Sequence, residues 1–161
     1  MPINIKPATV RDVPVVLRMI RGLAEYEKLL DACSATEAQL CESLFGPHPA
    51  AEVIIAWDAD EAVGFALFFH NYSTVLAQRG LYLEDLFVLP EWRGRGVGRL
   101  LLERLAQIAV ERDCGRLEWT VLDWNRPAIG FYQRVGATPM ADWTIYRLTG
   151  QPLRRLASRG Q

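Results

Sequence analysis

The most constraining feature of the sequence is a loop of glycine and arginine, RGRGVG at residues 93–98, that separates two strong periodic patterns. Residues 81–88 form an apolar run typical of a strand, and residues 97–112 place apolar side chains at helical spacing. Glycines leave backbone N–H groups uncovered, and the helix adds the positive end of its dipole. The segment therefore predicts a pyrophosphate site, to which Arg93 and Arg95 contribute charge.

Three familiar phosphate-binding loops do not fit these residues. A P-loop requires a Gly-Lys pair, and the chain contains none. A dinucleotide GxGxxG motif and a kinase glycine loop both require glycine where Arg99 stands. A flexible surface turn, kept soluble by its arginines, is the alternative explanation. The strand before the loop and the amphipathic helix after it favour the phosphate site.

The remaining periodicity predicts a mixed sheet. Residues 13–24 have helical spacing after a cap at Thr9 or Asp12, and a second helix covers 36–45 with Thr36 as its N-cap. The other expected elements are strands at 3–6, 52–57, 62–70, 116–122 and 142–148, a hairpin turn at 58–61, a polar loop at 71–79 and a helix at 126–134. This order predicts an α/β (α+β) fold with helices on both faces of the sheet. Residues 1–161 are expected to form a single domain, with a frayed tail after about residue 150.

Composition excludes several classes of function. A formal net charge of −1 gives no field suited to duplex nucleic acid. No apolar run approaches the ~18 residues that cross a membrane. The three cysteines have no C-x-x-C spacing and the two histidines have no paired ligands. The sequence therefore predicts reduced thiols, a cytoplasmic protein and no metal site.

Several motifs, in order along the chain, carry a resemblance to a known family. Arg93-x-x-Gly96-x-Gly98 resembles the acetyl-CoA signature of the GNAT acetyltransferases. Four further segments resemble the diamine acetyltransferases, which include spermidine/spermine and thialysine N-epsilon-acetyltransferases: LAEYEK at 23–28, YLED at 82–85, VLDWN at 121–125, and Phe131-Tyr132 followed by Gly136-Ala137. The similarity extends from about residue 3 to residue 148.

The resemblance implies a fold in which strands four and five splay apart and acetyl-CoA enters the gap. Its pyrophosphate would lie on the loop amides, and the backbone of 86–88 would pair with the pantetheine arm. The implied acetyl-CoA residues are Leu86, Phe87, Val88, Arg93, Gly94, Arg95, Gly96, Val97, Gly98, Asn125 and Tyr132. The resemblance also implies a homodimer.

Acetyl transfer to an amine requires a proton acceptor, because a free alkylamine has a pKa of about 10.4 and is protonated at neutral pH. Glu84 is the candidate base, with Asp85 beside it. Adjacent residues of a strand point to opposite faces, so only one of the two is expected to face the acetyl group. An exposed polar pair is the alternative, but two acids in an apolar strand favour a site.

The departing thiolate requires a proton, and Tyr132 is the candidate acid because a phenol can donate to a nearby sulfur. From spacing alone, Phe131 and Tyr132 are more often packing aromatics; the resemblance favours the catalytic role. The resemblance and the pattern of acids and aromatics predict that the acceptor is a small cationic amine. The residues expected to bind it are Tyr26, Glu27, Glu84, Asp85 and Trp124.

One segment departs from the polyamine branch of the family. The loop of those enzymes resembles Tyr-Asp-Pro-Trp, where this chain has Tyr72-Ser73-Thr74-Val75. This chain therefore lacks one carboxylate and one indole at that place. The sequence therefore favours a lysine-like amine or a short diamine over a long polyamine. Two alternatives stay open: acetylation of protein lysines or N-termini, and a non-catalytic sensor of acyl-CoA.

Overall fold

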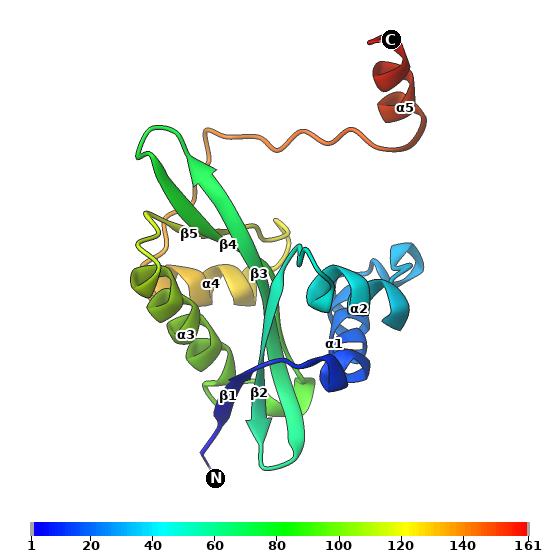
Figure 1. The fold of residues 1–161 in the computed structure, drawn as a ribbon. Helices are drawn as coiled ribbons and strands as arrows, with labels where there is room; N and C mark the ends of the chain where they lie inside the picture. Colours follow the sequence, from blue (N-terminus) through cyan, green and yellow to red (C-terminus); the bar gives the residue numbers. More distant parts are fainter. Residues whose placement is uncertain (1, 161) are drawn as a thin grey trace. The chain divides into compact units, whose positions relative to one another are not determined.

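A computed structural model describes residues 2–160, in two compact units divided after Leu122. The first unit contains a five-stranded sheet in the order β1-β2-β3-β4-β5, antiparallel except for the parallel pair β4 and β5 (Figure 1). Its strands are β1 (Asn4–Pro7), β2 (Glu52–Asp58), β3 (Glu61–Ser73), β4 (Gln78–Val88) and β5 (Leu117–Trp119). Its helices are α1 (Val13–Tyr26), α2 (Glu37–Phe45) and α3 (Val97–Glu111), with 3-10 turns at Val10–Asp12, Leu30–Ala32 and Pro90–Trp92.

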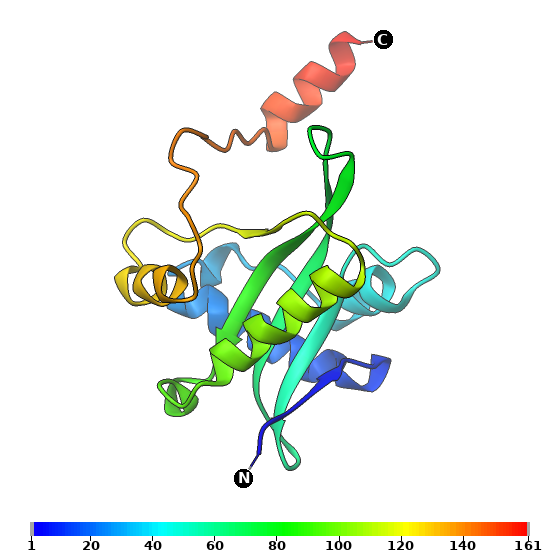
Figure 2. The same ribbon diagram turned by 90° about the vertical axis from the view of Figure 1, so that its left-hand side faces the viewer.

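Helices cover both faces of this sheet, as the sequence predicts. The two helices α1 and α2 lie on one face and α3 on the other (Figures 1 and 2). Val16, Ile55 and Phe65 are fully buried between the sheet and the first two helices. On the opposite face Leu101 and Leu105 of α3 are fully buried. Burial of each such side chain contributes about 1.5–3 kcal/mol to the stability of the fold. The apolar faces of the helices therefore hold them against the two faces of the sheet.

Several helix ends lie where the local sequence predicts them. Thr36 caps α2: its hydroxyl accepts from the Gln39 N–H at 3.2 Å, and its own N–H donates to the Gln39 side chain at 2.9 Å. Gly46 follows the last residue of α2, as predicted. The α3 helix begins after Gly96, whose φ of 83° lies in the left-handed region that favours glycine.

The pairing of β4 with β5 is short, which confirms the predicted splay. The two strands pair only from Leu81 opposite Leu117 to Leu83 opposite Trp119. Beyond that point β4 continues to Val88 while β5 ends. Among the residues that the structure describes, β4 therefore has a free edge on the β5 side over 84–88.

Three sequence expectations were wrong. Residues 71–79 are not a polar loop, because β3 and β4 continue as a hairpin until Ser73 pairs with Gln78. The strand expected at 116–122 shortens to β5. Residues 142–148 form no strand, since apolar alternation alone supplies no partner for the backbone. The tail contains a further helix, α5 (Gly150–Arg159), which begins after Thr149 and has no buried residues.

The second unit, residues 123–161, also contains α4 (Arg126–Arg134), which matches the predicted helix. Throughout residues 2–160, no helix combines the length and apolar character needed to cross a membrane.

Candidate functional site

The glycine–arginine loop forms an open turn between β4 and α3. Gly94 and Gly96 have φ of 76° and 83°, a conformation that costs any other residue backbone strain. A Cβ built at either glycine would meet nothing within 4 Å, so the space beside the backbone is open. The N-terminal N–H groups of α3 and its positive dipole end lie next to this space. The loop therefore has the form that an anion site requires.

The six predicted loop residues do not all face solvent. Val97 is 1% exposed and belongs to the core, so only its backbone is available to a ligand. A Cβ at Gly98 would contact the Val88 side chain at 3.7 Å, which places this glycine where α3 packs on β4. The open part of the loop is therefore 93–96.

The two arginines of the loop have different surroundings. The Arg93 Nε donates a hydrogen bond to the Val88 carbonyl at 3.1 Å, and its guanidinium carbon lies 4.8 Å from the centre of the Tyr26 ring. The Arg95 guanidinium carbon instead lies 4.7 Å from the centre of the Trp92 ring. Sequence reasoning had treated both only as positive charges for a phosphate.

A β-bulge in β4 changes the arrangement of the two predicted acids. Leu67 of β3 pairs with Asp85 and the next residue, Phe68, pairs with Leu83, so Glu84 has no partner opposite it. A bulge breaks the strict alternation of side chains between the two faces. The expectation that Glu84 and Asp85 point to opposite faces therefore does not hold here.

Three carboxyl groups interact near the end of α1. Burial raises the pKa of Asp85 to about 7, with further contributions from the charges of Glu84 and Glu27. Burial, followed by the charge of Glu84, also raises the pKa of Glu27, the residue directly after α1. Sequence reasoning named all three residues, and the structure places them within electrostatic reach of one another. We call Glu27, Glu84 and Asp85 the acidic cluster.

The remaining predicted residues lie in the second unit. Asn125 caps α4, where its side-chain oxygen accepts from the Ala128 N–H at 3.4 Å. Tyr132 lies inside α4, and its ring centre is 5.6 Å from that of Phe131. Trp124 is 46% exposed. The assignment of these three residues to the site stays a prediction.

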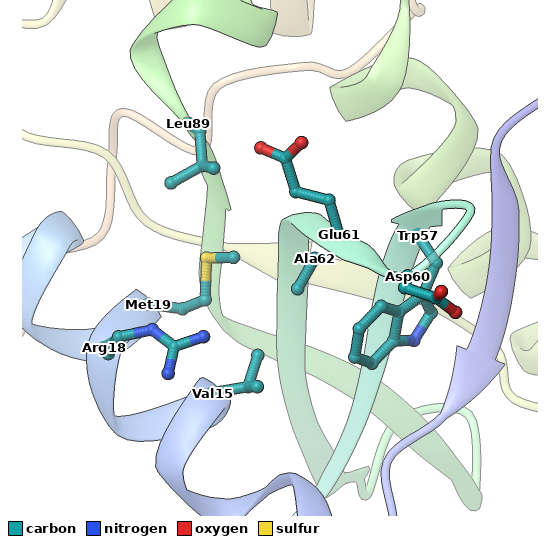
Figure 3. Close-up of a pocket in the computed structure, with 8 residues that line it drawn as sticks. All are labelled: Val15, Arg18, Met19, Trp57, Asp60, Glu61, Ala62 and Leu89. Carbon is teal, nitrogen blue, oxygen red and sulfur yellow. The ribbon is translucent and has the colours of Figure 1, made fainter. Parts of the chain in front are cut away.

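A cavity that the sequence did not indicate lies between α1 and the β2–β3 hairpin (Figure 3). It has a volume of about 640 Å³ and an apolar lining of Val15, Met19, Trp57, Ala62 and Leu89, with the charged residues Arg18, Asp60 and Glu61. None of the predicted site residues lines it. No local signal could have found it, because its residues come from α1, the β2–β3 hairpin and the end of β4, and each is ordinary in its own element.

Comparisons with known proteins agree with this geometry. The sequence profile described as "Acetyltransferase (GNAT) family" matches residues 22–137. The chain is 36% identical to a thialysine N-epsilon-acetyltransferase of Bos taurus, covering 98% of each chain. It is 32% identical to an L-ornithine N5-acetyltransferase of Arabidopsis thaliana, covering 95% of this chain and 87% of that protein. An integron cassette protein from the mobile metagenome of V. cholerae has a similar structure, with a TM-score of 0.82 at 31% identity and 98% coverage of both chains.

Proposed function

The chain belongs to the GNAT acetyltransferase family and is an N-acetyltransferase, and from this premise we propose that its acceptor is a small cationic amine. The acceptor class that fits is a thialysine- or lysine-like amine or a short diamine. The acidic cluster is the observation that carries the proposal. Three neighbouring carboxyl groups attract an ammonium group, and one with a pKa of about 7 can also accept its proton.

The GNAT family uses acetyl-CoA as co-substrate, and we assign the donor site to the loop and the free edge of β4. The pyrophosphate would bind the amides of 93–98, with charge from Arg93 and Arg95. The pantetheine arm would pair with the backbone of 86–88, where β4 has lost β5 as a partner. We also assign Asn125 to the pantetheine arm.

We assign the proton transfers to a coupled pair and a phenol. The coupled pair of Glu84 and Asp85 takes one proton from the amine: Asp85, which ionises near pH 7, receives it, and the charge of Glu84 raises the pKa of Asp85. Tyr132 returns a proton to the departing thiolate. Tyr26, Glu27 and Trp124 bind the acceptor, with the aromatic faces and the carboxylate attracting its positive charge.

The turn between β3 and β4 supports a short acceptor. Residues 74–77 lie in this turn, and Tyr72 and Val75 are 63% and 87% exposed. The turn and its neighbour Ser73 offer no carboxylate and no indole that could hold the far end of a long polyamine. The names of the thialysine and L-ornithine acetyltransferase relatives point to the same class of acceptor.

We further infer a cytoplasmic homodimer in which residues 1–161 act as one acetyltransferase domain. All three cysteines are free thiols, in keeping with a reducing compartment. Exposed apolar side chains in the second unit, among them Trp143, Ile145 and Tyr146, are suited to burial against another copy of the chain.

The function is tested by following thiol release from acetyl-CoA with a panel of amines at pH 7–9. The panel contains thialysine, lysine, ornithine, putrescine, spermidine, spermine and a lysine-containing peptide. We expect the highest kcat/KM with thialysine, lysine, ornithine or putrescine. Preference for spermine or spermidine would contradict the argument from Ser73 and Val75. Turnover of the peptide but of none of the small amines would identify protein lysines as the acceptor. CoA binding without any turnover would indicate a sensor.

The donor site is tested by replacing Gly96 with Ala. We expect the KM for acetyl-CoA to rise about tenfold, because the left-handed backbone costs roughly 1 kcal/mol and the methyl group enters the open space where the phosphate would lie. Gly150→Ala is the matched control, since Gly150 has a positive φ of 58° outside the loop. An equal rise of the KM in both variants would show that backbone strain, and not the loop, sets donor binding.

A further inference from the structure

Arg93 contacts two elements of the first unit, β4 and α1, with one side chain. Its Nε donates to the Val88 carbonyl at 3.1 Å, at the end of β4. Its guanidinium carbon lies 4.8 Å from the centre of the Tyr26 ring and 5.5 Å from that of Phe87. Tyr26 is the last residue of α1 and directly precedes Glu27 of the acidic cluster. The first residue of the phosphate loop is therefore joined to the acceptor side of the candidate site.

The chemistry of this contact is specific to arginine. The planar guanidinium directs its Nε–H at a carbonyl while its carbon lies near two aromatic rings, and a lysine ammonium cannot reproduce both contacts. Arg95 differs, because its ring contact is with Trp92, within the turn that precedes the loop. The two arginines carry the same charge but meet different elements.

We propose that Arg93 is a positioning residue for the amine acceptor: it holds the last turn of α1, with Tyr26 and Glu27, against the end of β4. This role goes beyond the charge that Arg93 offers to a phosphate. It rests on the proposed assignment of the acidic cluster to the acceptor. The last turn of α1 has backbone bonds, including Glu27 N–H to the Leu23 carbonyl at 2.9 Å, and Leu23 and Tyr26 pack against the core that contains Phe87. The Arg93 side chain adds a directional contact to this apolar packing, because it meets the Tyr26 ring and the Val88 carbonyl together.

The kinetic test compares Arg93→Lys, Arg93→Met and Arg95→Met in the full-length protein, with acetyl-CoA and with S-acetylpantetheine, a donor that lacks the diphosphate. We expect both Arg93 variants to raise the KM for the amine about threefold to fivefold with either donor, with a smaller change in kcat. Arg95→Met is expected to raise the KM for acetyl-CoA and to leave the KM for the amine at the wild-type value. An effect of Arg93→Met confined to acetyl-CoA, or full recovery in Arg93→Lys, would overturn the proposal and leave Arg93 as a phosphate ligand.

A second readout does not depend on turnover. Hydrogen exchange of the ligand-free proteins reports on the amides of Glu27, Lys28 and Leu29, which bond back to α1. We expect exchange there to be about threefold faster in both Arg93 variants and unchanged in Arg95→Met. Equal exchange in all four proteins would overturn the positioning role. If no amine is acetylated, the proposed function fails, while the exchange measurement still decides the role of Arg93.

Discussion

Tyr132→Phe is expected to lower kcat by about 100-fold, because general acid catalysis typically contributes at least this factor. Without the phenol, CoA must leave as an unprotonated thiolate. Binding of CoA, measured by calorimetry, is expected to change little, since the ring and its contact with Phe131 are retained. The defect should diminish at high pH, because a thiol that is ionised in water needs no proton as it departs.

The matched control for this prediction is Tyr146→Phe. Tyr146 is 93% exposed, and it has no assigned role in the site, so removal of its hydroxyl should leave kcat unchanged. A Tyr132→Phe enzyme with kcat within about threefold of wild type would show that Tyr132 is a packing aromatic, the alternative that its spacing favours.

Asp85→Asn is expected to lower kcat/KM for the amine by about 100-fold at pH 7.5, through loss of the proton acceptor. In the wild-type enzyme the Asp85 carboxyl, with a pKa of about 7, must be ionised to accept a proton. The rate should therefore fall about tenfold per pH unit below this pKa. This acidic limb of the pH–rate profile should be absent in Asp85→Asn.

Glu84→Gln separates the two members of the coupled pair. The charge of Glu84 raises the pKa of Asp85, so its removal should shift the acidic limb of the pH profile to lower pH while turnover persists. If instead Glu84→Gln abolishes turnover and Asp85→Asn keeps it, Glu84 is the sole base and the assignment of the pH 7 ionisation to Asp85 is wrong.

The same pKa shift predicts a gain in stability for Asp85→Asn. The folded-state pKa of Asp85 lies above its ordinary value of 3.8, so the folded protein loses stability as the pH rises from about 4 to about 7. The amide variant avoids the buried charge and should be more stable by about 1–2 kcal/mol at pH 8, with a smaller difference at pH 5. Urea unfolding at the two pH values checks this. A variant less stable than wild type at pH 8 would contradict the burial of an ionised carboxylate.

The sequence by itself determined the elements whose signals are local. The apolar stripe of 97–112, the cap at Thr36 and the helix at 126–134 all appear as predicted, because helices and their caps depend on residues within a few positions. The order of these elements and the motifs around 93–98 also identified the fold and the family.

Only the tertiary structure decided how the candidate site is arranged. Register depends on the partner strand, so the bulge that removes the alternation of Glu84 and Asp85 cannot be deduced from β4 alone. A pKa depends on burial and on charges from other elements, which is why the raised pKa of Asp85 cannot be deduced from β4 alone. The contact of Arg93 with Tyr26 joins positions 67 residues apart, and the segment at 142–148 lacks the strand partner that its alternation suggested. Local composition fixes helices and caps, whereas register, burial and long-range contacts exist only once the chain has folded.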